Sequence, residues 1–157
     1  MEPIIDHIDR EILRRLQADA SISNLELSRA VGLSASACLA RTRNLKESGV
    51  IRQSTVLIDE QKVGIGTVAF ALVDLMPFDR AAAQKFVAYI RDLPQIQECY
   101  TLTGSHDFLL KIVAGSMAEY RDFLIDHLLS FPGISKVETS MVLSADKRTL
   151  CLPIPER

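Results

Sequence analysis

The stretch that decides the fold runs from Asn24 to Ile51 and reads NLELSRAVGLSASACLARTRNLKESGVI. Apolar residues one turn apart predict a short helix from about Asn24 to Val31, with its first residue as the N-cap. Gly32 follows at a place where a left-handed residue commonly ends a helix. Ser34 is a favourable N-cap for a longer helix from about Ala35 to Ser48. A short helix, a tight turn and a longer helix form the plan of a helix-turn-helix.

The longer helix lies in the one locally basic segment of a chain whose net charge is −2. Helical spacing puts Cys38, Thr42 and Leu45 on its core-facing side. The outward side carries small residues early and Arg or Asn later, and it consists of Ser36, Ala40, Arg43 and Glu47, flanked by Ala37 and Asn44. Small residues let a helix approach base edges, and Arg reaches phosphates or guanine. The pattern therefore favours DNA binding over a plain three-helix bundle with a solvated charged face.

The residues on either side of this stretch extend the helical part and then leave it. From Ile5 to Leu16 apolar residues recur at spacings of three and four, and Asp6 can cap the helix with Asp9 in its first turn. The segment VIRQSTVLI after Gly49 alternates and is rich in β-branched residues. It therefore predicts a strand that leads out of the helical part.

The second half of the chain alternates between strands and helices. We expect strands at Thr67–Leu75, Ile96–Thr103, Asp107–Ala114 and Ser135–Ser144, with helices at Asp79–Leu93 and Ser116–Phe131. Their order is that of the ferredoxin-like unit, an antiparallel sheet with both helices on one face. In the second helix the residues expected to face inward are Met117, Tyr120, Leu124 and Leu128. Because the inner strand TVAFALVDL is apolar on both faces, we expect a second copy of the chain to cover the bare face.

Composition narrows the class of protein and its compartment. The chain is 48% hydrophobic and 24% charged, and it has neither a long apolar run nor a secretory-type start, so a cytoplasmic protein with no membrane contact is expected. The cysteines (Cys38, Cys99 and Cys151) are few and widely spaced, and the three histidines are scattered. These spacings predict neither a disulfide framework nor a metal site, and no cofactor is expected. Cys38 is expected to be a buried hydrophobic residue and not a redox sensor.

The chain resembles the Lrp/AsnC family of transcriptional regulators over essentially its whole length. The resemblance rests on five segments in the same order, which are IDHIDREILRRLQADA, LSASACLARTRNLKESGVI, VGIGTVAFALV, TLTGSHDFLLKIV and VETSMVLSADKRTLCLPI. It implies an α+β chain with an N-terminal winged helix-turn-helix followed by a ferredoxin-like βαββαβ sensing domain. We expect a DNA-binding domain at 1–52, a linker strand and hinge at 53–66, and an effector-binding and oligomerisation domain at 67–157.

The resemblance also implies the partners. These are a roughly palindromic double-stranded operator, and an amino acid or related small molecule bound between dimers that alters DNA binding or assembly. The homodimer would assemble further into a tetramer or octamer. The DNA-binding residues implied are Ser34, Ser36, Ala37, Ala40, Arg41, Arg43, Asn44 and Arg52. Of these, Arg41 lies at the edge of the buried face, so the sequence leaves open whether it braces the helix, touches phosphate or reads a base.

The loop sequence Gly104-Ser105-His106-Asp107 contains the three residue types of a hydrolase triad. Consecutive residues entering a strand point to alternating sides, so these three side chains do not converge. The resemblance instead makes this loop part of the effector site, whose residues would be Thr103, Gly104, Ser105, His106, Asp107, Thr139 and Ser140. The carboxylate of Asp107 could accept hydrogen bonds from an α-ammonium group or fix the loop through its backbone. An ordinary turn is the alternative interpretation.

Two other functions remain open from the sequence. Some proteins that resemble this family are sirohaem decarboxylases, with a His-Asn-Tyr stretch near the second strand and a Tyr-Asn-x-Trp stretch on the third. Here the corresponding places read ECYTL and HDFLL, and the chain has no tryptophan, so we expect a protein that is not an enzyme. The other alternative is a ligand-binding or assembly module that no longer binds DNA.

Overall fold

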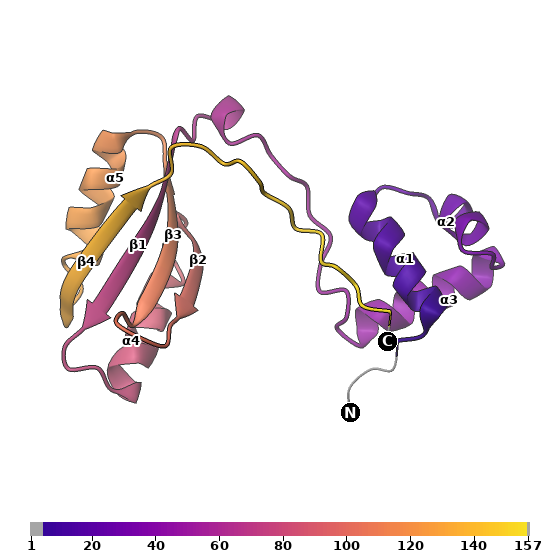
Figure 1. The fold of residues 1–157 in the computed structure, drawn as a ribbon, viewed down its shortest axis with the longest axis horizontal. Helices are drawn as coiled ribbons and strands as arrows, with labels where there is room; N and C mark the ends of the chain where they lie inside the picture. Colours follow the sequence, from indigo (N-terminus) through magenta and orange to yellow (C-terminus); the bar gives the residue numbers. More distant parts are fainter. Residues whose placement is uncertain (1–4, 157) are drawn as a thin grey trace. The chain divides into compact units, whose positions relative to one another are not determined.

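The computed structural model describes residues 5–156, which form two compact units (Figure 1). One unit runs as far as Leu57 and also contains the C-terminal residues from Lys147 onward. The other runs from Ile58 to Asp146. The sequence placed the C-terminal residues in the sensing domain, whereas the contacts group them with the helices.

The first unit is built from three helices, α1 (His7–Ala18), α2 (Asn24–Ala30) and α3 (Ala35–Glu47). They enclose a core of Ile12, Leu27, Cys38 and Leu45, none of which is more than 4% exposed. The burial of Cys38 and Leu45 confirms the predicted inward face of α3.

The helix caps of this unit agree with the sequence at two of three positions. The carboxylate of Asp6 accepts from the Asp9 amide at the start of α1, and the hydroxyl of Ser34 accepts from the Ala37 amide at the start of α3. The prediction for α2 was wrong by one residue. Ser23 is its N-cap, because Ser23 and Glu26 form a reciprocal capping box.

The strand predicted for VIRQSTVLI is absent. Residues 50–58 have no strand hydrogen bonding, and the side chains of Val56, Leu57 and Ile58 are 79%, 76% and 63% exposed. A strand needs a partner to satisfy its backbone groups, and this segment pairs with no strand among residues 5–156. A short 3-10 turn, η1 (Gln61–Val63), follows before the sheet begins.

The second unit is the expected ferredoxin-like fold. Its elements are β1 (Thr67–Leu75), α4 (Arg80–Ile90), β2 (Ile96–Thr101), β3 (Phe108–Ala114), α5 (Met117–Phe123), η2 (Leu124–Leu128) and β4 (Ile134–Met141). The strands pair antiparallel in the order β2-β3-β1-β4. The helices α4 and α5 bury Phe86, Ile90, Tyr120 and Phe123 against one face of that sheet.

The second helix of this unit departs from the predicted pattern. It changes from α-helix to π-helix at Leu124, where one extra residue enters the turn. Met117, which was expected to face inward, is 56% exposed, and Phe123 is buried instead. Tyr120 and Leu128 are buried as predicted.

No helix of the second unit, as the structure describes it, packs on the other face of the sheet. On β1, Ala69, Ala71 and Val73 are fully buried on the helix side, whereas Phe70 and Leu72 are half-buried on the open side. Register places Leu109 and Lys111 of β3 beside them. The centre of the open face therefore carries the apolar side chains Phe70, Leu72 and Leu109 beside the charged residue Lys111.

Candidate nucleic-acid interface and effector loop

The outward side of α3 is a continuous exposed surface. Ser36, Ala40, Arg43 and Asn44 are exposed, as predicted from helical spacing, and Ala37 beside them is half-buried. The guanidinium side chain of Arg43 is 76% exposed, and its ion pair with Glu47 is long, at 3.9 Å. Such a pair is weak in water, so Arg43 is available to an external anion.

The start of α3 is fixed by contacts with the turn and with α2. Ser34, besides capping the helix, shares a 3.2 Å hydrogen bond with the hydroxyl of Ser36. The Asn24 amide donates to the Ala35 carbonyl at 2.8 Å, which joins α2 to α3. Gly32 in the turn has a φ of 71°, a conformation that favours glycine. These contacts therefore hold the start of α3, with its small exposed residues, in a fixed position relative to the turn and α2.

Arg41 forms ion pairs with two aspartates of its own unit. Its Nη1 donates to Asp6 Oδ2 at 2.7 Å and to Asp9 Oδ1 at 2.9 Å, which ties the start of α1 to the middle of α3. Hydrogen bonding from the Asp9 amide and from Arg41 lowers the pKa of Asp6 to about 2. Of the three roles that the sequence left open for Arg41, the structure contains the bracing one.

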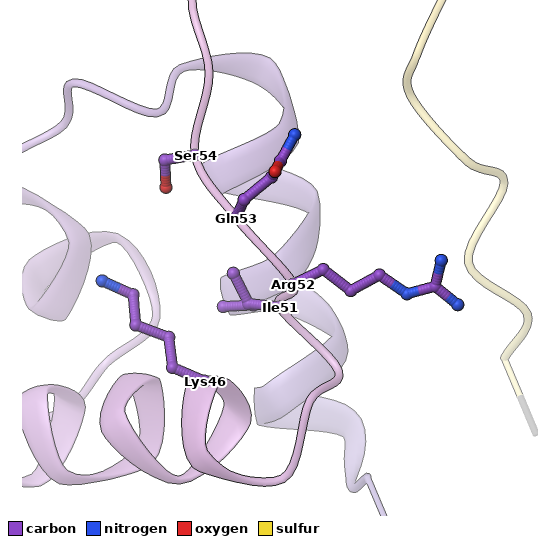
Figure 2. Close-up of a pocket in the computed structure, with 5 residues that line it drawn as sticks. All are labelled: Lys46, Ile51, Arg52, Gln53 and Ser54. Atoms are coloured by element: carbon purple, nitrogen blue, oxygen red, sulfur yellow. The ribbon is translucent and has the colours of Figure 1, made fainter. Parts of the chain in front are cut away.

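An open pocket lies between the end of α3 and the segment that follows it (Figure 2). It is lined by Lys46, Ile51, Arg52, Gln53 and Ser54. In Figure 2 the side chains of Lys46 and Arg52 extend to opposite sides of this segment. Arg52 is exposed, as a residue that binds phosphate must be.

Sequence reasoning missed two exposed residues of α3. Leu39 is 57% exposed on the surface of the helix, where an apolar group can contact a thymine methyl. Lys46 is exposed at the rim of the pocket. The local excess of basic residues could have indicated Lys46, but no pattern distinguishes Leu39 from a core leucine.

The loop between β2 and β3 is tight and closed by backbone hydrogen bonds. The Leu102 amide donates to the Asp107 carbonyl at 2.9 Å. Gly104 has a φ of 128°, a conformation that other residues rarely adopt, and open space surrounds the place where a Cβ would stand. Thr103, Gly104 and Ser105 are exposed. The tip of the loop therefore faces outward on a constrained backbone.

Asp107 anchors this loop to the end of β1. Its Oδ2 accepts from the Leu75 amide at 2.8 Å, and its own amide donates to the Val73 carbonyl at 3.2 Å and to Asp74 Oδ1 at 3.3 Å. Leu75 is 5% exposed, so water does not replace that acceptor easily. Of the two roles that the sequence left open for Asp107, the structure contains the one that fixes the loop.

His106 belongs to a small charged cluster and not to a triad. Its Nδ1 lies 3.1 Å from Asp74 Oδ1, and its Nε2 lies 3.9 Å from Glu138 Oε2. Lys136 forms an ion pair with Glu138 on the same strand. The ring thus contacts carboxylates of β1 and β4, while Ser105 stays at the exposed tip of the loop.

Thr139 and Ser140 lie on opposite faces of β4. Thr139 pairs in register with the buried residue Ala71, and its hydroxyl is 2.6 Å from that of Tyr120. Ser140 pairs with Phe70 on the open face and is exposed. Of these two predicted effector residues, Ser140 is the one that faces away from the helices.

The described residues contain no candidate for a metal site and no membrane span. Within residues 5–156 no three His, Cys, Asp or Glu side chains form a group that could hold an ion. Over the same range no helix is both long and apolar enough to cross a bilayer.

Two family models match the chain. A winged helix-turn-helix DNA-binding model covers residues 5–52. A model described as the Lrp/AsnC ligand binding domain covers residues 68–150.

Relatives match over nearly the whole chain. The transcriptional regulator AzlB of Bacillus subtilis is 55% identical and covers 98% of both chains. The leucine-responsive regulatory protein of Salmonella typhimurium is 37% identical over 98% of this chain and 93% of its own length. A transcriptional regulator from Neisseria meningitidis, solved as a complex with L-Met, is 35% identical with a TM-score of 0.91 over 96% of this chain and 97% of its own. Two of these relatives are named as transcriptional regulators and the third as a regulatory protein.

Proposed function

The chain belongs to the Lrp/AsnC family of transcriptional regulators, with a helix-turn-helix DNA-binding domain and a ligand-binding domain, and on that premise we propose how it binds DNA and its effector. In this proposal α3 enters the major groove. The exposed residues Ser36, Ala40, Arg43 and Asn44 face the bases, with Ala37 beside them. Ser34 and Arg52 contact the phosphates, and Lys46 and Leu39 join this surface.

The DNA-binding part of the proposal rests on a difference between two arginines of α3, of which one forms internal ion pairs and the other is exposed. Arg41 is neutralised by Asp6 and Asp9, whereas Arg43 is 76% exposed beside small residues. Small side chains allow a helix to enter the major groove, and a free guanidinium can bind phosphate or guanine there.

We propose that the effector is an amino acid bound against the loop Thr103–Asp107, with Ser140 at the edge of the site. The regulator of known structure from Neisseria meningitidis was solved with L-Met, which supports a ligand of this class. An amino acid offers an ammonium and a carboxylate group. The cluster of His106, Asp74, Glu138 and Lys136 carries both charge signs beside the loop.

We propose a homodimer as the working unit, formed through the open face of the sheet. Half-buried Phe70 and Leu72, together with Leu109, are apolar side chains on a face that no helix covers. Burial of such a surface by a second copy stabilises an assembly. A two-fold axis would present two α3 helices to a roughly palindromic operator. Larger assemblies of dimers would place effector loops of different dimers together.

In this proposal the chain consists of a DNA-binding domain at 1–52, a linker at 53–66 and an effector-binding domain at 67–157.

A thermal-unfolding screen of the twenty amino acids tests the effector proposal. A ligand that binds only the folded protein at about 100 times its Kd stabilises it by roughly 2.7 kcal/mol, which raises the unfolding temperature by several degrees. We expect one amino acid or a small chemical group of them to do so. A screen in which no amino acid raises the unfolding temperature contradicts the proposal.

A pair of arginine substitutions tests the location of that site. Ser105→Arg adds bulk and charge at the exposed tip of the loop and should abolish the thermal shift. Gln84→Arg makes the same chemical change at an exposed position of α4 and should leave the shift intact. An equal shift in both variants would place the ligand elsewhere.

A further inference from the structure

The C-terminal segment Cys151–Glu156 lies against α1 of its own chain (Figure 1). Gln17 makes the central contacts. Its Oε1 accepts from the Leu152 amide at 2.6 Å, and its Nε2 donates to the Leu152 carbonyl at 3.1 Å. One side-chain amide thus satisfies both backbone groups of a single residue, as a neighbouring strand would.

Three further contacts flank this pair. Cys151 Sγ lies 3.3 Å from the Gln17 carbonyl, which is one of the last carbonyls of α1 and lacks a helical partner. Arg14 Nη2 donates to the Ile154 carbonyl at 3.3 Å and to Glu156 Oε1 at 2.6 Å. Arg14 and Gln17 are three residues apart, so they share one face of the helix.

The sequence of the segment suits this binding mode. Leu152, Ile154 and Glu156 make the contacts and alternate with Pro153 and Pro155. Proline has no amide to satisfy, and it keeps the residue before it extended. The segment is therefore already extended before it binds, which lowers the conformational entropy that binding removes.

An exposed C-terminal segment held only by a surface ion pair is the simpler alternative. The Glu156 side chain is 86% exposed, and an ion pair of that kind contributes little and is screened by salt. The two hydrogen bonds of Gln17 to Leu152 do not depend on charge. The side chain of Leu152 is 74% exposed, so Gln17 binds the backbone of the segment and not its side chain.

The binding changes how the two units are joined. The linker that enters β1 connects them once, and the residues between β4 and Cys151 connect them a second time. We propose that the face of α1 formed by Arg14 and Gln17 is a docking surface for the chain's own C-terminal segment, which gives the DNA-binding unit a second attachment to β4. This inference goes beyond the proposed function and does not depend on the identity of the effector.

Amide hydrogen exchange in the full-length protein tests the docking. Gln17→Ala removes both hydrogen bonds to Leu152 while favouring the helix, and we expect the Leu152 amide to exchange at least about fivefold faster than in the parent. Arg15→Ala, next along α1 from Arg14, changes a residue that pairs with Glu11 and should leave that rate unchanged. Equal exchange in the parent and in Gln17→Ala would overturn the proposal.

Two changes in the segment itself give an independent measurement. Leu152→Pro removes the bound amide without altering α1, and the order parameter of the Ile154 amide should fall below about 0.6, the range of a flexible backbone. Leu152→Ala keeps the amide and should retain the parent value. An Ile154 amide that is flexible in the parent, or equally ordered in both variants, would contradict the docking.

Dilution distinguishes the chain's own segment from that of a second copy. Docking within one chain does not depend on protein concentration, so the exchange rate of Leu152 should stay constant on dilution. A rate that rises on dilution would assign the docked segment to another copy and overturn the proposal.

Discussion

Replacing Asp107 with alanine should destabilise the sensing unit even when no effector is present. The change removes the acceptor of the Leu75 amide, which lies 2.8 Å from Asp107 Oδ2. Leu75 is 5% exposed, so its amide would be left without a partner. An unsatisfied buried donor costs about 1–3 kcal/mol. For a unit of this size that corresponds to a fall in unfolding temperature of about 5–20 °C.

The isosteric change Asp107→Asn separates the structural role from a role in ligand binding. Asparagine keeps one oxygen that can accept from Leu75, so most of the stability should remain. If the charged carboxylate also binds an ammonium group, this variant should lose about 10- to 100-fold in effector affinity, the equivalent of a charge-assisted hydrogen bond of roughly 1.5–3 kcal/mol.

Differential scanning calorimetry without ligand is the assay for the structural role. Asp122→Ala is the matched control, because Asp122 is an exposed aspartate of the same unit that pairs with its neighbour Arg121. We expect the parent, Asp122→Ala and Asp107→Asn to unfold at similar temperatures. Asp107→Ala should unfold at a clearly lower temperature. If Asp107→Ala unfolds at the parent temperature, the anchoring role of this carboxylate is refuted.

Three further predictions concern the helices and the open face of the sheet. The pKa of Asp6 is lowered from 3.8 to about 2, so the ionised carboxylate stabilises the folded unit above pH ~4. That contribution to stability disappears as the pH falls towards 2. Arg41→Ala should therefore make the stability depend less on pH between these values, as measured by circular dichroism. Cys38→Ser puts a hydroxyl where the side chain is fully buried and should lower the free energy of unfolding by about 1–3 kcal/mol in denaturant titrations, whereas an unchanged midpoint would show that the site tolerates a polar group. Phe70→Asp places a charge on the open sheet face and should give monomers in sedimentation experiments, and a variant that remains dimeric would exclude this face as the interface.

The order of the elements could be predicted from the sequence because each depends on local patterns. The apolar period of α1, the cap at Ser34 and the apolar run of β1 are each encoded by residues close together in the sequence. These signals were sufficient for the helix-turn-helix and for the ferredoxin-like sheet. The outward face of α3 follows from the same periodicity, so the exposed residues of the proposed DNA-binding surface were also predictable.

The features that could not be predicted depend on partners far away in the sequence. VIRQSTVLI has the composition of a strand but lacks a partner strand in the part of the chain that the structure describes. His106 contacts Asp74, which is 32 residues away, and Gln17 contacts Leu152, which is 135 residues away. No local spacing indicates such pairs. The π-helical turn at Leu124 was likewise not predicted, since the apolar spacing of this helix indicates a regular α-helix.

The salt dependence of DNA binding tests the central claim most directly. The measurement uses fluorescence anisotropy with a duplex that the protein itself has selected from a random pool, over a series of salt concentrations. The parent should show a linear fall of log K with log salt. Arg52→Ala removes a proposed phosphate contact and should reduce the slope by about 0.9 for each protomer, whereas Arg43→Ala removes a proposed base contact and should weaken binding by roughly 1–3 kcal/mol at each salt concentration. Arg121→Ala, an exposed arginine of the sensing unit, should keep the parent slope. Binding that does not depend on salt, or equal affinity of the parent and Arg43→Ala for the selected duplex, would contradict the assignment of the exposed face of α3 as the DNA-binding surface.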